Sequence, residues 1–130
     1  MVRIVVSVRV LVVVALTGVV SSAALCAGGG TSVRIVLRAT PAAPARVTTL
    51  RCNPPSGSVA HPAQACSRLL AAGRAIFAPT PPGSACTQIY GGPQEAIVTG
   101  TLHGMHIWAR FRRRDGCELA RWHRVAFLLS

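Results

Sequence analysis

Four runs of the chain have the hydrophobic pattern of β-strands. In the first run, Val33, Ile35 and Leu37 alternate with Arg34, Val36 and Arg38, so one face of an extended segment is apolar and the other carries the charges. The three later runs are extended or rich in β-branched residues. The predicted strands span residues 32–38, 46–52, 95–102 and 105–112, and residues 125–129 end the chain as another apolar run.

A different period predicts a helix over residues 62–72. Pro62 stands at its start, and Cys66, Leu69 and Leu70 follow the i, i+3, i+4 spacing of one helix face. Gly73 is a typical residue to end such a helix. This is the one helix that the hydrophobic pattern predicts.

Two further segments are predicted to be irregular. Residues 53–57 have the composition of a turn. Residues 78–86 are rich in proline, glycine and serine, and we expect an exposed loop there because prolines lack a backbone N–H. The pattern as a whole predicts an α+β fold, in which a small antiparallel sheet carries one helix.

Residues 1–27 have the features of a secretory signal peptide. Arg3 and Arg9 precede an apolar run over residues 10–20, and small residues follow it. The run is shorter than the roughly 20 residues of a membrane-spanning helix, and the bulky Leu25 disfavours lipid attachment at Cys26. We therefore expect cleavage after Ala27 and a secreted, extracellular protein without a membrane anchor. Its one domain would span residues 28–130 and begin with a flexible glycine leader.

The cysteines support export. Loss of Cys26 would leave an even number in a domain of about 100 residues, which is typical of a secreted domain with two disulfides. The remaining cysteines are Cys52, Cys66, Cys86 and Cys117, and the sequence permits three pairings.

Charge and composition argue against most enzyme classes. The chain has 14 basic residues, all arginine, against 3 acidic residues, and its formal charge is +11. Loss of Arg3 and Arg9 lowers that charge by two, to +9. With Glu95, Asp115 and Glu118 as its carboxylates, the chain offers little to a hydrolase with paired acids or to a hard cation. We expect no enzyme activity and no cofactor.

The histidines do not suggest a metal site. His103 and His106 flank a turn that contains Gly104, and on a strand residues three apart point to opposite faces. We therefore predict that the chain binds no metal ion.

Several short motifs occur in one order along the mature chain. They are Val47-Thr48-Thr49-Leu50-Arg51-Cys52-Asn53-Pro54-Pro55-Ser56-Gly57, His61-Pro62 before Ala65-Cys66 and Leu69, Cys86-Thr87-Gln88-Ile89-Tyr90, Val98-Thr99-Gly100-Thr101-Leu102-His103-Gly104, and Cys117-Glu118. In this order they resemble the secreted subtilisin inhibitors of Streptomyces-type bacteria. The resemblance covers nearly all of the mature chain.

The resemblance implies a fold and an assembly. The fold would be a five-stranded antiparallel sheet with two short helices, and the protein would be a homodimer formed through the sheet face. The implied disulfides are Cys52–Cys66 and Cys86–Cys117. They close loops of about 15 and 32 residues, for which chain entropy gives roughly 3 to 4 kcal/mol of stabilisation each.

The resemblance also implies a reactive-site loop that a serine endopeptidase accepts as a substrate. The scissile bond would join Gln88 to Ile89, with Gln88 in the primary specificity pocket of the protease. Thr87 and Tyr90 would contact the neighbouring subsites, and Cys86 would tether the loop to the body of the protein. A rigid loop of this kind loses little entropy on docking, which separates an inhibitor from a substrate.

The identity of Gln88 bears on the target. A trypsin-like pocket pairs a cation with a buried carboxylate, and neutral glutamine would leave that carboxylate unpaired. A broad subtilisin-like pocket accepts unbranched side chains. We therefore expect inhibition of subtilisin-type proteases, weakened because glutamine buries less apolar area than methionine or leucine.

Two segments depart from the family pattern. Gly91-Gly92-Pro93 has one residue more than the family's turn after the tyrosine, and its glycines predict flexibility there. Residues 110–116 are more charged than the family segment that braces the loop. Asp115 is a candidate to support the loop with a hydrogen bond from below, and the prolines in residues 79–82 are candidates to stiffen the approach to it.

The arginines suggest an alternative function. Six of them would form a basic patch that binds nucleic acid or acidic cell-envelope polymers by charge, and we expect no specific nucleic-acid partner. Trp108 would lie on the same side of its strand as the arginines, either on a partner or in a dimer face. The six are Arg110, Arg112, Arg113, Arg114, Arg121 and Arg124.

A further alternative concerns Gln88 alone. An accessible glutamine on a loop can serve as the glutamine donor of a secreted transglutaminase, and members of the resembling family can serve such enzymes. In that case the side chain of Gln88 would be modified instead of entering a protease pocket.

Overall fold

The computed structural model describes residues 29–130. The predicted signal peptide, residues 1–27 with Cys26, lies outside the described residues. None of the described helices has the length and apolar composition that crossing a bilayer requires.

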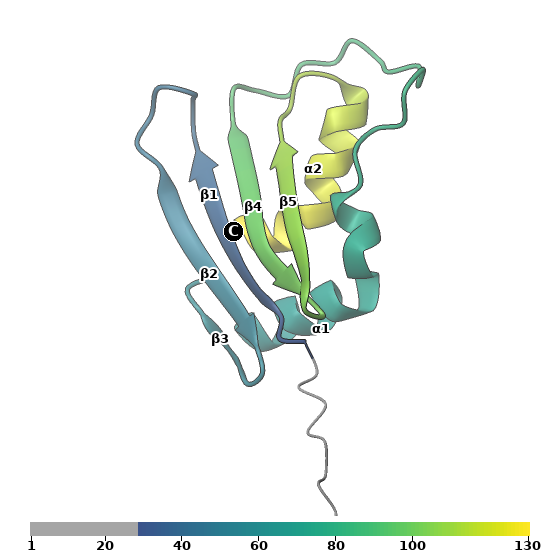
Figure 1. Cartoon of the computed structure of the whole chain (residues 1–130). Coiled ribbons are helices and arrows are strands. Elements are labelled where there is room, and N and C mark those ends of the chain that lie inside the picture. Colours follow the sequence, from purple (N-terminus) through teal and green to yellow (C-terminus); the bar gives the residue numbers. More distant parts are fainter. Residues whose placement is uncertain (1–28) are drawn as a thin grey trace, which may run out of the picture.

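The described chain forms one antiparallel sheet in the spatial order β3-β2-β1-β4-β5 (Figure 1). In this order β1 is the central strand, and its apolar alternation fits a sheet with one face against the core. Val33 faces Leu50 on one side and Gly100 on the other. The strands are β1 (Ser32–Arg38), β2 (Arg46–Cys52), β3 (Pro55–Gly57), β4 (Glu95–Leu102) and β5 (Met105–Phe111).

The four predicted strands are confirmed, with β5 ending one residue early. The predicted turn over residues 53–57 is partly wrong, because it contains β3, which pairs Ser56 with Arg51. Gly57 makes this pairing possible: its φ is +130°, and a side chain there would collide with the carbonyl of Thr49. A three-residue strand is too short for an alternating pattern to reveal.

The predicted helix is confirmed as α1 (Pro62–Ala72), which continues into the 3₁₀ helix η1 (Gly73–Phe77). The prediction of a single helix is wrong. Residues 125–129 are the last turns of α2 (Gly116–Leu129), so the second helix that the family resemblance implies is present. Its buried positions include Arg121 as well as Val125 and Leu128, and this charged residue interrupts the apolar stripe by which a helix is recognised.

Both helices cover the same face of the sheet (Figure 1). Helix α1 packs against β2 and β3, whereas η1 lies against β5 and α2 contacts β1 and β5. The core between them is apolar, and its fully enclosed side chains include Ile35, Leu50, Leu69, Leu102, Phe111 and Leu128. No described helix covers the opposite face, where 68% of Trp108 is exposed.

Both implied disulfides are present. Cys52–Cys66 joins the end of β2 to α1 with its Cα atoms 5.4 Å apart, and Cys86–Cys117 joins the long loop to α2 with Cα atoms 5.3 Å apart. Of the three pairings that the cysteine count permits, the structure contains the one that the family resemblance implies.

The glycine leader is not free where the structure describes it. The carbonyl of Gly30 accepts hydrogen bonds from the Gly104 N–H (3.2 Å) and from the Thr101 hydroxyl (3.1 Å). A side chain on Gly29 would collide with the backbone of Gly104. The leader residues Gly29 and Gly30 therefore pack against the turn between β4 and β5.

The burial of α1 predicts a contrast between adjacent leucines. Leu69 is completely buried, so Leu69→Ala should lower the free energy of unfolding by about 2–5 kcal/mol through lost burial and a cavity. Leu70 is 37% exposed, and Leu70→Ala should cost less than about 1 kcal/mol. Urea unfolding of both variants with disulfides intact measures the difference, and equal losses would contradict this packing.

Candidate functional site

A long loop rises above the end of the sheet near the start of α2 (Figure 1). It runs from Ala78 to Gln94 and has no helix or strand. Four consecutive side chains at its outer edge are exposed, including Ile89 at 58% and Tyr90 at 66%. Because Tyr90 and Ile89 are large and apolar, their exposure suggests a contact with another molecule. The four residues are Thr87, Gln88, Ile89 and Tyr90.

The exposed residues lie between anchors on both sides. Cys86 is bonded to Cys117, and the carbonyl of Thr87 accepts a hydrogen bond of 2.9 Å from the Gly116 N–H. On the far side, the Gly91 N–H donates to the carbonyl of Arg113 at 2.7 Å. All three anchors come from residues 113–117, the segment that joins β5 to α2.

The approach to the loop is held by a buried arginine. Arg121 is 8% exposed, its Nε donates to the carbonyl of Ala78 at 2.9 Å, and its guanidinium carbon lies 4.9 Å from the ring centre of Phe111. Burial lowers the pKa of the Arg121 guanidinium, while the nearby carboxylate of Glu118 opposes this effect. Helix α2 therefore fixes both the beginning of the loop and its outer part.

The glycines after the tyrosine have a packing role. A side chain on Gly91 would collide with Leu119 of α2, and Gly92 has a φ of +130°, which favours glycine. Gly91, one of the two glycines for which the sequence predicts flexibility, thus lies close against the helix, and its N–H is one of the anchors.

The predicted hydrogen bond from the Asp115 side chain to the loop is wrong, because this side chain has a different partner. Its Oδ1 accepts a hydrogen bond of 2.9 Å from the N–H of Glu118 and so caps the start of α2. The two hydrogen bonds that anchor the loop to this segment are made by backbone groups, the Gly116 N–H and the Arg113 carbonyl. Asp115 therefore contributes by fixing the helix that carries the anchors.

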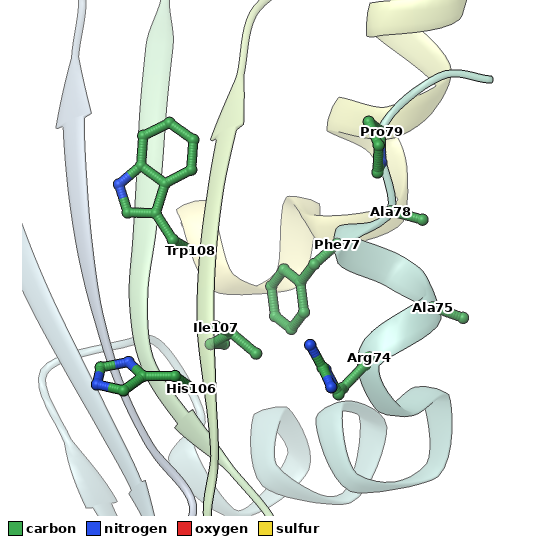
Figure 2. Close-up of a pocket in the computed structure, with 8 residues that line it drawn as sticks. All are labelled: Arg74, Ala75, Phe77, Ala78, Pro79, His106, Ile107 and Trp108. Carbon is green, nitrogen blue, oxygen red and sulfur yellow. The ribbon is translucent and has the colours of Figure 1, made fainter. Parts of the chain in front are cut away.

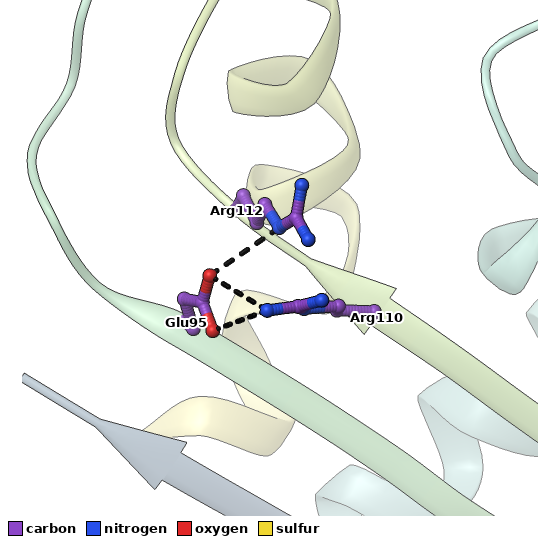
Figure 3. Close-up of polar contacts among 3 residues, drawn as sticks. All are labelled: Glu95, Arg110 and Arg112. Atoms are coloured by element: carbon purple, nitrogen blue, oxygen red, sulfur yellow. Dashed lines mark hydrogen bonds and ion pairs between the residues drawn. The ribbon is translucent and has the colours of Figure 1, made fainter. Parts of the chain in front are cut away.

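An ion cluster fixes the end of β5, just before the anchors (Figure 3). Arg110 donates to both oxygens of Glu95 at 2.8 and 3.0 Å, and Arg112 Nε lies 3.3 Å from the same carboxylate. The hydrogen bond from Arg110 holds the pKa of Glu95 below its ordinary value, and the nearby arginine charges add to this effect against burial. The cluster joins β4 to the strand that leads into residues 113–117.

The structure does not keep the six predicted patch arginines together on one open surface. Arg110 and Arg112 are paired with Glu95, and Arg121 is buried. Arg113 donates to the Gln94 side chain at 2.9 Å, and its guanidinium carbon lies 5.6 Å from the ring centre of Trp122. The remaining two, Arg114 and Arg124, are exposed.

A pocket lies at the free edge of β5 (Figure 2). Its residues do not have the arrangement of a catalytic site. Ile107 and Phe77 lie on one side of the strand, whereas His106 and Trp108 lie on the other. The polar groups of the pocket therefore do not point toward one another, as a catalytic site would require.

One group of side chains among the described residues has the composition of a metal site. Cys86, Asp115 and Cys117 place their ligand atoms within 4.8 Å of one another. The two sulfur atoms are joined in a disulfide, and metal binding needs thiolates. The structure therefore assigns this group to the loop anchor.

The fold and the anchored loop agree with a family comparison. The family model for subtilisin inhibitor-like domains matches residues 28–113, which include the sheet, α1 and the loop. The chain belongs to the subtilisin inhibitor-like family. No curated protein matches the chain. The family match supports a protease-inhibitor fold, and it ends before Cys117 and α2.

The depressed pKa of Glu95 predicts a pH-dependent contribution to stability. The ion cluster should stabilise the protein above the unfolded-state carboxyl pKa of about 4.3 and lose this effect as the pH falls further. Glu95→Gln lacks that contribution, so its stability deficit should be largest near neutral pH and shrink toward pH values of about 2. Denaturant unfolding of both proteins across this range measures it, and a constant deficit would contradict it.

Proposed function

We propose that the protein is a secreted serine protease inhibitor, with Gln88–Ile89 as the bond that it presents to the protease. The observation that carries the proposal is the exposed stretch from Thr87 to Tyr90, anchored on both sides by residues 113–117. Family membership supports the same conclusion. Export and cleavage after Ala27 are part of the proposal, and the two disulfides fit an oxidising compartment.

The mechanism follows from the anchors. A serine protease binds an extended peptide along its cleft and directs the scissile carbonyl toward its oxyanion donors. The exposed loop has this extended shape before binding, so it loses little conformational entropy when it docks. If the protease cleaves between Gln88 and Ile89, Cys86 and Gly91 keep the new ends in place, so the bond can form again. Turnover is then slow and the complex persists.

Subtilisin-type proteases are the proposed target class. Gln88 is unbranched and exposed, and its Nε2 makes one long hydrogen bond, 3.5 Å, to the carbonyl of Cys86. A broad pocket can accept such a side chain, whereas a trypsin-like pocket would keep an unpaired buried carboxylate.

We also propose a homodimer through the sheet face that no described helix covers. The cross-strand row of Val47, Val36 and Ile97 lies on this face, with Trp108 exposed nearby. Burial of such apolar side chains would drive two copies together. The mass of the protein in sedimentation experiments decides whether it forms.

Titration of active subtilisin tests the inhibitor and the role of Gln88. The unmodified protein should inhibit stoichiometrically, and Gln88→Met should inhibit more strongly because methionine buries more apolar area. Gln88→Gly should raise the inhibition constant by about 30-fold, the roughly 2 kcal/mol of a truncated interface hot spot.

The same titration can refute the proposal. If all three proteins leave subtilisin fully active at micromolar excess with both disulfides intact, the loop does not inhibit this class of protease. If the unmodified protein inhibits and Gln88→Gly does so equally well, another residue enters the specificity pocket.

Arg121 predicts a separate effect on loop rigidity. Arg121→Met removes the hydrogen bond to Ala78 and should make the protease hydrolyse the Gln88–Ile89 bond several-fold faster, so that inhibition becomes temporary. Arg124→Met is the matched control on an exposed position of the same helix. Chromatography of the cleaved chain over time measures the rate. Equal rates in both variants would show that the Ala78 contact does not restrain the loop.

A further inference from the structure

A small hollow adjoins the exposed stretch of the loop, on the side where the chain leaves it. Its lining comes from Tyr90 and the turn after it, from residues 112–114, which are all arginine, and from Glu95 and Pro41. These residues follow β5, begin or precede β4, or lie between β1 and β2. The hollow is therefore at the loop end of the sheet, beyond the apolar row on the face proposed for the dimer.

The hollow has an excess of positive charge. Three guanidinium groups line it against one carboxylate, that of Glu95. This carboxylate is already bound by Arg110 and Arg112 (Figure 3). Arg113 is engaged as well, because it donates to the side chain of Gln94 and lies near the ring of Trp122. An added ligand of negative charge would therefore be attracted to the hollow without competing for a free carboxylate.

Arg114 is the arginine of the hollow that stays unengaged. Its side chain is exposed, and it makes no hydrogen bond or ion pair with residues 29–130. Its charge helps to lower the pKa of Glu95, but the two other arginines hold that carboxylate. The carbonyl of the preceding residue, Arg113, anchors Gly91, so the backbone of Arg114 has a fixed place relative to the loop.

Docking of a protease on the loop would cover this arginine. With Gln88–Ile89 as the scissile bond, Tyr90 is the second residue on the leaving-group side, and a protease that holds the loop along its cleft contacts it. Tyr90 lines the same hollow as Arg114, so the protease surface beside Tyr90 comes to lie over the hollow. Removing water from an unpaired guanidinium costs free energy, whereas an opposite charge at the same place compensates for that cost.

We propose that the hollow receives a carboxylate side chain of the protease, with Arg114 as its partner. The planar guanidinium group can bind both oxygens of such a carboxylate. This inference rests on the proposed inhibitor function and adds a selectivity to it. Among subtilisin-type proteases, the protein prefers those that carry aspartate or glutamate beside the subsite for Tyr90. Gln88 then selects by the shape of the primary pocket, and Arg114 by charge on the other side of the scissile bond.

A double-mutant cycle between inhibitor and protease tests this contact. The proteases are a subtilisin with a neutral rim at the subsite for Tyr90 and a series with one glutamate at each position of that rim. For at least one glutamate, the unmodified inhibitor should gain about tenfold in affinity, and Arg114→Gln should lose most of this gain. Added salt should reduce the gain, because a charge pair at the edge of an interface is screened.

Arg124→Gln is the matched control. Arg124 is also exposed, but it lies on α2 near Ala78 and Pro79, on the side where the chain enters the loop. It removes the same charge as Arg114→Gln and should keep the gain from glutamate. Equal losses in both variants would show attraction by net charge alone and would overturn the proposal. A gain that Arg114→Gln retains, or no gain with any glutamate, would overturn it as well.

The same cycle separates this inference from the proposed function. If the unmodified protein inhibits neither the neutral subtilisin nor any glutamate variant, the inhibitor function is refuted and this inference with it. If it inhibits the neutral subtilisin but shows no coupling between Arg114 and a glutamate, the inhibitor function stands and the carboxylate contact alone is refuted.

Discussion

The junction between β5 and α2 is the constraint on which the loop depends. Residues 113–117 provide a carbonyl, an N–H and a sulfur atom to the loop within five positions. The junction is itself held by the Glu95 ion cluster before it and by the Asp115 cap after it. Helix α2 then buries Val125 and Leu128 in the core, so the anchors cannot shift without disturbing the packing of the whole domain.

Arginine has two distinct roles in this protein. In the interior and around the junction, the guanidinium group donates hydrogen bonds to carbonyl or carboxylate oxygens or lies over an aromatic ring. Arg121 does both, with the carbonyl of Ala78 and the ring of Phe111. Beside the loop, Arg114 has no such partner among the described residues and lines the hollow next to Tyr90. A formal charge of +11 therefore says little about where an acidic partner would bind. What matters is which arginines the fold leaves unengaged.

The layered architecture separates the loop from the sheet face proposed for the dimer. Because both helices cover one face of the sheet, the other face is left for the proposed dimer contact, and the loop projects from the end of the sheet beside α2 (Figure 1). Substitutions on this uncovered face can therefore change dimer formation without moving the loop anchors in residues 113–117. The disulfides contribute at different places: Cys52–Cys66 ties α1 to the sheet, and Cys86–Cys117 ties the loop to α2.

The sequence alone determined the elements whose signals are local. The alternation in Val33 to Leu37 predicts β1, and the spacing of Cys66, Leu69 and Leu70 predicts α1, because backbone geometry sets both periods. The family motifs predicted the disulfide pairing. Only the tertiary structure decided the short strand β3, the helical state of residues 125–129 and the partners of the arginines. Those outcomes depend on contacts between distant residues, such as Arg121 with Ala78 across 43 positions, and such contacts leave no periodic signal in the chain.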